Sequence, residues 1–277
     1  MKKIIFYIFF AAALVGIYSS CTKSNDYIAP YTTVDPNSLT TSYVKFVHAS
    51  PYFRNIFGVA DTFNVIVNGT KINSPFLSFG GTSIAPVLTT GYGYVSIPSG
   101  ALQIKLSTNG TTTGDSIAFK IYSKTVSPGQ FYTFLLTDSA LTGNPAKEMF
   151  IRDSTPVAYS GYYNLRFINA VGNDSATTST GTKTVDIYSY ARNATLWTKI
   201  GVDSVTTFSL LGTNSFVADT LYVTRTPASG SPVLSGRVVL AKLALSPLSR
   251  NYTIYYKGDG TLATGTKARA LAYYINQ

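Results

Sequence analysis

The chain has 277 residues, of which 45% are hydrophobic and 12% are charged. This composition supplies apolar material for one large or two ordinary cores, and it excludes a globally disordered chain. The formal net charge is +10, but the cations are scattered and form no run longer than a pair. Nucleic-acid binders usually cluster their basic residues on one element, so we expect no nucleic-acid partner.

The first 20 residues predict an export signal. Lys2 and Lys3 form a positive start, and the following segment Ile4–Ile17 contains no charged residue. Such a segment fits the apolar part of a signal peptide, and it is shorter than the roughly 20 residues that span a membrane. The expected place of the mature protein is therefore outside the cytoplasm.

Cys21, the single cysteine, directly follows Ser19 and Ser20. This arrangement resembles the lipobox of bacterial lipoproteins, in which the signal is cut before a cysteine that then carries diacylglycerol. Tyr18 stands where leucine is usual. The resemblance implies lipid attachment at Cys21, whereas the other hypothesis is a reactive thiol at the end of an ordinary signal. Residues 21–42 are rich in Thr, Ser, Asn and Pro, which predicts a flexible tether behind the lipid that the resemblance implies at Cys21.

The rest of the chain repeats itself in the same order after about 120 residues. The matching pairs are "YVKFVHAS" with "NLRFINAV", "FNVIVNGT" with "VDIYSYAR", "SPGQFYTF" with "SPLSRNYTI", and "AKEMFI" with "TKARAL". The repeat predicts two tandem domains, at residues 43–152 and 162–277, with a linker at 153–161. The second domain is the divergent copy.

Apolar residues alternate with others along both copies, as in "ALQIKL" and "IAFKIY". Alternation with period two predicts strands that have one face on a core and one in water. Val238–Ser246 could pass for a helix, but it aligns with Phe119–Ser127, which is rich in β-formers, so we expect both to be strands. The predicted fold is all-β: two tandem antiparallel β-sandwiches of immunoglobulin-like or transthyretin-like type.

Four segments of the first copy, "VKFVHASP", "FNVIVNG", "YVSIPSGALQIKL" and "SPGQFYTFLL", resemble the domain of unknown function 4397. The first copy has Asn64 where that family usually has Asp, and the second copy has Asp186 but has Asn169 in place of the family's His. The resemblance implies a β-sandwich in an exported, envelope-associated bacterial protein, often a lipoprotein of the Bacteroidota. It implies no established activity.

His48 is the only histidine and lies on the same side of its predicted strand as Val44 and Phe46. We expect a buried structural role, because the mature chain offers no second imidazole or thiol for a metal site or a nucleophile–base pair. A triad through His48 stays open as an alternative, although no Gly-x-Ser-x-Gly elbow is present. We therefore predict no catalytic residue, no metal site and no cofactor.

Six aspartates are followed by Ser or Thr and then by a small or aliphatic residue or Thr. This pattern resembles the O-glycosylation signal of Bacteroidota, although Asp-Ser is also good turn chemistry. The candidate O-glycosylation residues are Ser116, Ser139, Ser154, Ser175, Ser204 and Thr220.

The expected function is that of a non-enzymatic lipoprotein of tandem sandwiches, active in surface adhesion, assembly or scaffolding. Its expected place is the cell envelope, lipid-anchored in the outer membrane and either periplasmic or surface-exposed. The expected partners are the membrane, through the lipid, and an envelope protein or a glycan. Surface glycan binding is the alternative, since Tyr (21) and Phe (16) are abundant. A hydrolase acting through a pair of Asp residues is a weaker one.

Overall fold

The computed structural model describes residues 40–51, 62–73, 77–80, 93–107, 118–137, 148–172, 184–212, 218–225, 233–246, 248 and 250–276. These residues lie within one compact unit, Pro36–Gln277. Their regular structure is entirely strand, which confirms the predicted all-β fold of β-sandwiches. No helix that could cross a membrane occurs in the described ranges.

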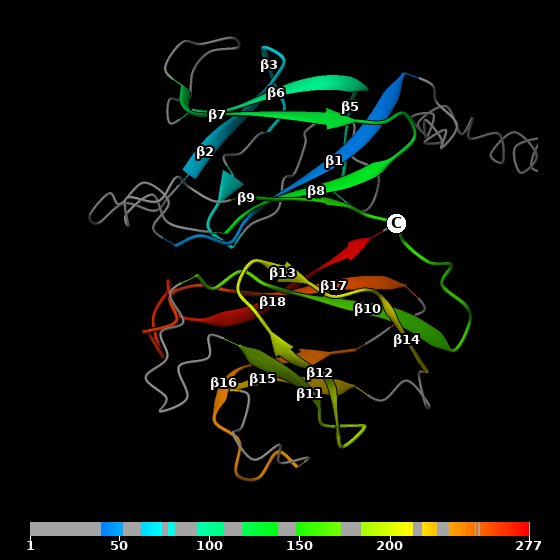
Figure 1. Cartoon of the computed structure of the whole chain (residues 1–277), viewed down its shortest axis with the longest axis vertical. Helices are drawn as coiled ribbons and strands as arrows, with labels where there is room; N and C mark the ends of the chain where they lie inside the picture. Colours follow the sequence, from blue (N-terminus) through cyan, green and yellow to red (C-terminus); the bar gives the residue numbers. More distant parts are fainter. Residues whose placement is uncertain are drawn as a thin grey trace, which may run out of the picture. The chain divides into compact units, whose positions relative to one another are not determined.

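The first sandwich consists of two sheets (Figure 1). One sheet has the order β5-β1-β8-β9, formed by Val95–Pro98, Thr41–His48, Phe131–Leu136 and Glu148–Arg152. The other has the order β3-β2-β6-β7, formed by Thr70–Lys71, Thr62–Val67, Gly100–Ser107 and Ala118–Val126, with β4 (Leu77–Ser78) beside β2.

The second sandwich has the same plan. One sheet has the order β13-β10-β17-β18, formed by Ser204–Val205, Tyr162–Asn169, Asn251–Lys257 and Ala270–Asn276, with β14 (Ser209–Gly212) also paired to β10. The other has the order β12-β11-β15-β16, formed by Ala194–Ile200, Val185–Ser189, Asp219–Arg225 and Val239–Leu245. Strand β16 confirms that the ambiguous segment near Val238 is extended.

Each sandwich has its own apolar core, and the period-two alternation explains which residues enter it. In the first, Phe46 of β1, Val65 of β2 and Leu102 of β6 belong to one buried cluster. In the second, Phe167 of β10 and Ile187 of β11 belong to another. Both clusters join residues of two sheets, so each core lies between the sheets of its own sandwich.

The sandwiches are not purely antiparallel, which corrects the expected pattern. Strand β1 runs parallel to β8, and β10 runs parallel to β17, while the other ladders are antiparallel. Two parallel neighbours cannot be joined by a tight hairpin, because the chain must return to the starting end of the sheet. Here the chain between β1 and β8 passes through the opposite sheet, which provides that return (Figure 1).

The central strands of one sheet in each sandwich are buried on both faces. On β1 the residues between core positions, such as Val47, are as buried as the core residues themselves, and Ile168 of β10 behaves in the same way. A third apolar cluster explains this burial, because it joins Val47 and Leu135 of the first sandwich to Ile168 and Tyr255 of the second. The expected water-exposed face is therefore absent on these strands.

Candidate functional site

Besides the buried Arg237–Asp186 pair within the second sandwich, the described residues present two further regions with concentrated polar chemistry. The first is a buried network between the two sandwiches, here called the interface network. Its members are Lys45, Tyr94, Thr133, Asp153, Arg166, Thr253, Tyr274 and Asn276. The second is an open hollow on the outer face of β6 and β7, here called the β6–β7 hollow.

The repeat places the same kinds of residue on both sides of the interface network. Lys45 of β1 pairs in register with Thr133 of β8, and Arg166 of β10 pairs with Thr253 of β17. Lys45 and Arg166 occupy the same place in "YVKFVHAS" and "NLRFINAV". Each sandwich thus contributes one basic residue and one threonine from equivalent parallel strands.

Asp153 is the anion at the centre of the network. Its carboxylate pairs with the Arg166 guanidinium, and the two side chains are 0% and 4% exposed. The same carboxylate accepts hydrogen bonds from the Tyr94 hydroxyl at 2.8 Å and from the Thr133 hydroxyl at 2.7 Å. Three donors therefore satisfy this carboxylate, which is the condition for keeping a buried charge.

Lys45 has no carboxylate in direct hydrogen-bond contact among the described partners. Its Nζ donates to the backbone carbonyl of Ile275 at 2.6 Å and lies 4.3 Å from the ring centroids of both Tyr94 and Tyr274. Burial lowers the pKa of Lys45 from 10.5 to about 7, the Asp153 charge raises it, and the Arg166 charge lowers it further. The amine is thus held in a dry aromatic cage.

The neighbouring tyrosines are held in the neutral form. Burial raises the pKa of Tyr94 well above its usual value, and the Asp153 charge raises it further. Burial also raises the pKa of Tyr274. Asn276 donates to the Tyr94 hydroxyl at 2.9 Å, and Tyr274 donates to Thr133 at 3.3 Å. The network is a closed set of donors and acceptors, which suits it to joining the sandwiches.

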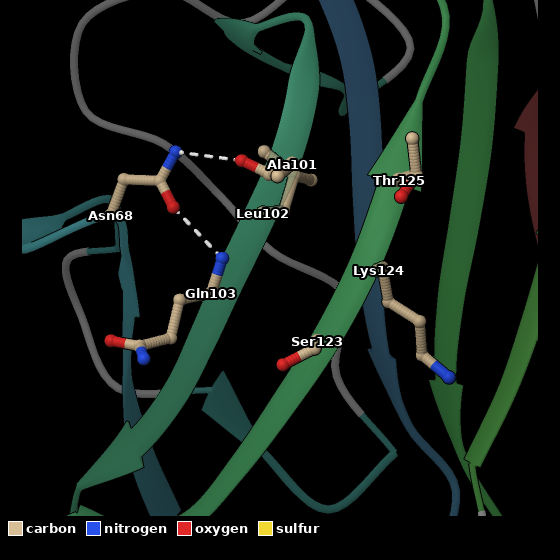
Figure 2. A pocket seen from close by; sticks show the side chains of 7 residues that line it. All are labelled: Asn68, Ala101, Leu102, Gln103, Ser123, Lys124 and Thr125. Atoms are coloured by element: carbon tan, nitrogen blue, oxygen red, sulfur yellow. Dashed lines mark hydrogen bonds between the residues drawn. The ribbon is translucent and has the colours of Figure 1, made fainter.

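The β6–β7 hollow has a volume of about 640 Å³ and is open to solvent. It is lined by Asn68, Ala101, Leu102, Gln103, Ser123, Lys124 and Thr125. Figure 2 shows the Asn68 side chain bridging to the backbone of β6. Its Nδ2 donates to the Ala101 carbonyl at 3.4 Å, and its Oδ1 accepts from the Gln103 backbone N–H at 2.8 Å. Neutral amides and hydroxyls therefore dominate its exposed surface.

Local sequence explains how Asn68 reaches this position. Asn68 and Gly69 have φ values of 47° and 82°, which is the backbone of a tight hairpin turn between β2 and β3. The Asn68 backbone also donates to the Gln103 carbonyl at 2.9 Å. The predicted Asn-Gly turn thus fixes one rim of the hollow.

Strand β7 forms the other rim and pairs, among the described strands, with β6 alone. Lys124 lies on the core-facing side of this strand, and its Nζ lies 2.9 Å from the Glu148 carboxylate of β9. A charged residue placed at an edge strand discourages uncontrolled pairing with other strands. The edge is long but protected.

His48 is fully buried, as expected, and packs in the first sandwich. Its ring centroid lies 5.2 Å from that of Phe63 and 6.1 Å from that of Phe79. Its backbone carbonyl accepts from the Gly80 amide at 2.7 Å, and the Asn169 carbonyl accepts from Asp203 in the same way at 2.8 Å. Both copies therefore use this position to hold a loop.

Three of the six candidate glycosylation residues lie in described segments. Ser154 is exposed after β9, Ser204 is half-buried at the start of β13, and Thr220 is half-buried in β15. The preceding aspartates have structural partners: Asp153 joins the interface network, and Asp219 accepts from Ser189 and from the Ala191 amide. Modification of these residues stays a prediction.

The remaining predicted site residues, Cys21, Ser116, Ser139 and Ser175, lie outside the described residues. In the described segments no three His, Cys, Asp or Glu side chains come together as a metal site would require. Sequence reasoning missed the interface network altogether. The available signal was a basic residue at the same place in two otherwise apolar strands, Lys45 and Arg166.

Residues 42–177 match the family model described as "Domain of unknown function (DUF4397)". The match covers the first sandwich and continues through β10 of the second. A comparison with functionally curated proteins finds no match.

Two solved structures give low-scoring matches. The TIE protein of Bacillus anthracis is 12% identical, with 79% of this chain and 33% of that protein covered and a TM-score of 0.18. The present chain thus spans a third of that protein's length. A DUF1812 protein of Bacteroides thetaiotaomicron is also 12% identical, with 85% and 96% covered and a TM-score of 0.19. Such scores extend neither fold nor activity to this chain.

Proposed function

Since residues 42–177 carry a domain of the DUF4397 family, we propose that the chain is a non-enzymatic lipoprotein of the cell envelope. In this proposal the diacylglycerol on Cys21 holds the chain in the outer membrane through the tether. The joined sandwiches then form a stiff body that binds an envelope partner in adhesion, assembly or scaffolding.

One observation carries this proposal: Lys45, whose pKa is lowered to about 7 mainly by burial, and the buried Asp153–Arg166 pair are used to join the sandwiches. Perturbed groups in an exposed cleft would favour catalysis. Lys45, Arg166 and Asp153 instead lie in a closed network, in which the whole residues are 1%, 3% and 5% exposed. A substrate has no route to these groups while the sandwiches remain packed, so their placement favours a structural role.

The β6–β7 hollow is the surface best suited to a partner. It combines exposed main-chain edge on β7 with the side chains of Gln103, Ser123 and Thr125. A strand edge supplies hydrogen bonds to an extended partner segment, and neighbouring side chains supply the selectivity. The Lys124–Glu148 pair limits indiscriminate pairing, which favours a specific partner over open-ended assembly.

Binding to the envelope tests the proposal. The body from residue 22 onward, added to intact cells that lack the protein, is expected to bind saturably. Ser123→Arg, which fills the hollow, should weaken that binding at least tenfold. Ala244→Arg is the matched control, because Ala244 is an exposed residue of another edge strand, β16. Equal binding by both variants would contradict the assignment to the hollow, and no binding by the parent would contradict the proposal.

The same assay separates a protein partner from a glycan partner. Protease treatment of the cells should abolish binding if the partner is a protein, whereas periodate oxidation should abolish it if the partner is a glycan. The described aromatic pair with the most exposed member, Tyr190 and Tyr222, is tilted by 54°. A flat sugar platform would need nearly coplanar rings, so a protein partner is expected.

Anchoring has its own test. Cys21→Ala should move the chain from the membrane fraction to the soluble fraction of lysed cells. Retention of the variant in the membrane fraction would contradict lipidation at Cys21 and leave the binding test unaffected.

A further inference from the structure

We propose that the contact between the two sandwiches is a proton-responsive joint, in which charging of the Lys45 amine loosens the packing of β1 against β18. The inference concerns the chain's own conformation and does not depend on the proposed binding partner. It rests on where the amine lies and on which charges face it.

The amine lies at the contact between the sandwiches. Lys45 belongs to β1 of the first sandwich, and its Nζ donates at 2.6 Å to Ile275 of β18 in the second. The two rings that enclose it also come from both sides, Tyr94 before β5 and Tyr274 on β18, each at 4.3 Å. A change in the charge of this amine therefore acts directly on the contact.

The charges around the amine do not balance when it is protonated. The groups that face it are Asp153 after β9, Arg166 on β10, and the neutral hydroxyls of Tyr94 and Tyr274. Asp153 already pairs with Arg166. A protonated Lys45 thus leaves two cations and one anion in a buried site, whereas a neutral Lys45 leaves one of each. Burying an excess charge is unfavourable.

The tyrosine faces attract the ammonium, but this attraction does not compensate for the loss of water. The pKa of Lys45 is about 7, compared with an ordinary value of 10.5, and burial is the largest cause. The closed joint therefore favours the neutral amine, while an opened joint would return the amine to water and to its ordinary pKa.

The direction of the response follows from proton counting. Between pH 7 and 10.5 the open joint binds more protons than the closed joint, so lowering the pH favours opening. The fraction of time spent open should rise about ninefold from pH 9 to pH 8 and about fivefold from pH 8 to pH 7. From pH 7 to pH 6 it should rise less than about twofold, because the amine is then charged in both states.

Hydrogen–deuterium exchange of the mature protein measures this opening. Peptides that cover β1 and β18 should lose protection as the pH falls from 9 to 7, after correction for the intrinsic exchange rate. Lys45→Met keeps a side chain of similar length without the charge. In this variant the corrected exchange of β1 and β18 should not change over this pH range. In Lys124→Met, which removes a partly buried pair on another edge, the exchange of β1 and β18 should respond to pH like that of the parent.

A second lysine near the joint must be separated from Lys45. Lys257 lies 4.5 Å from the Phe79 ring, and burial lowers its pKa as well. Lys257→Met should retain most of the pH response. If the response vanishes in Lys257→Met and survives in Lys45→Met, the assignment to Lys45 is wrong.

A measurement on the parent protein covers the case in which Lys45→Met folds poorly. Acetylation of each lysine can be followed against pH by mass spectrometry. At pH 8 and above, Lys45 should react only through the rare open state, and its acetylation rate relative to that of an exposed lysine should rise toward pH 7, since this ratio removes the effect of pH on the amine itself. A pH-independent exchange pattern in β1 and β18 of the parent would overturn the proposal.

Discussion

The interface network and the Lys124–Glu148 pair beside the β6–β7 hollow each combine a lysine, a carboxylate and an aromatic ring, but they differ in how far water reaches them. Lys45 is 1% exposed and lies 4.3 Å from two tyrosine rings. The Lys124 side chain is 23% exposed, pairs with Glu148 at 2.9 Å and lies 5.8 Å from Phe150. The buried groups join the two sandwiches, whereas the more exposed Lys124–Glu148 pair lies at an edge strand, where it discourages pairing with other strands.

The largest expected effect comes from breaking the buried pair of the interface network. Arg166→Met leaves the Asp153 carboxylate without its counter-charge in a dry site, which should cost about 3–5 kcal/mol of the free energy of unfolding. Urea denaturation measures this cost. The double variant Arg166→Met/Asp153→Asn should lose less than the sum of the two single variants, because the stranded charge is gone. A loss below about 1 kcal/mol for Arg166→Met would mean that the site is wet.

A smaller effect is expected from a neutral member of the same network. Tyr94→Phe removes a hydroxyl that donates to Asp153 and accepts from Asn276. Leaving these buried groups short of a partner should cost about 1–3 kcal/mol in the same denaturation experiment. Tyr190→Phe, at a residue that is 65% exposed, is the control and should be neutral. Equal stability of the two variants would remove Tyr94 from the network.

At the β6–β7 hollow, the Asn68-Gly69 turn should contribute more to the free energy of unfolding than the charged side chains do. Asn68→Ala puts alanine at a φ of 47° and removes two hydrogen bonds to β6. The expected cost is about 1–2 kcal/mol, mainly because alanine tolerates this backbone poorly. Asn68→Gly should recover most of the backbone part, and if it is as unstable as Asn68→Ala, the side-chain bonds dominate instead.

The smallest effect is expected at the partly exposed Lys124–Glu148 pair. Lys124→Met should change the free energy of unfolding by less than about 1 kcal/mol, because water and salt screen the pair with Glu148. The change should shrink further in 0.5 M salt. A loss as large as that of Arg166→Met would abolish the distinction between the two regions.

The strands could be predicted from the sequence, but their pairing direction and the residues that cover their outer faces could not. Period-two alternation and the Asn68-Gly69 turn predict extended segments because both are local properties of the chain. The parallel pairing of β1 with β8 was not foreseen, since alternation is the same in parallel and antiparallel ladders. Alternation also says nothing about what covers the second face, so the burial of Val47 against the other sandwich could not be read from it.

The interface network was missed for a related reason. A lysine between apolar residues in a strand is ordinarily assigned to water, and Lys45 fits that description. In the sequence Asp153 stands out only as the residue before Ser154, although its carboxylate binds residues from both sandwiches. Ion pairs between distant strands depend on packing that a single sequence does not contain.

The position of β1 has a mechanical consequence. Strand β1 begins at Thr41, near the end of the proposed tether, and it lies between β5 and β8 in the middle of its sheet. If the chain is anchored through Cys21 as proposed, a pull from its N-terminal side would load the hydrogen bonds to both neighbours together. Extracting β1 would also tear Lys45 away from Ile275 of the second sandwich. The strand that would receive the force is thus held by two ladders and by a contact to the second sandwich.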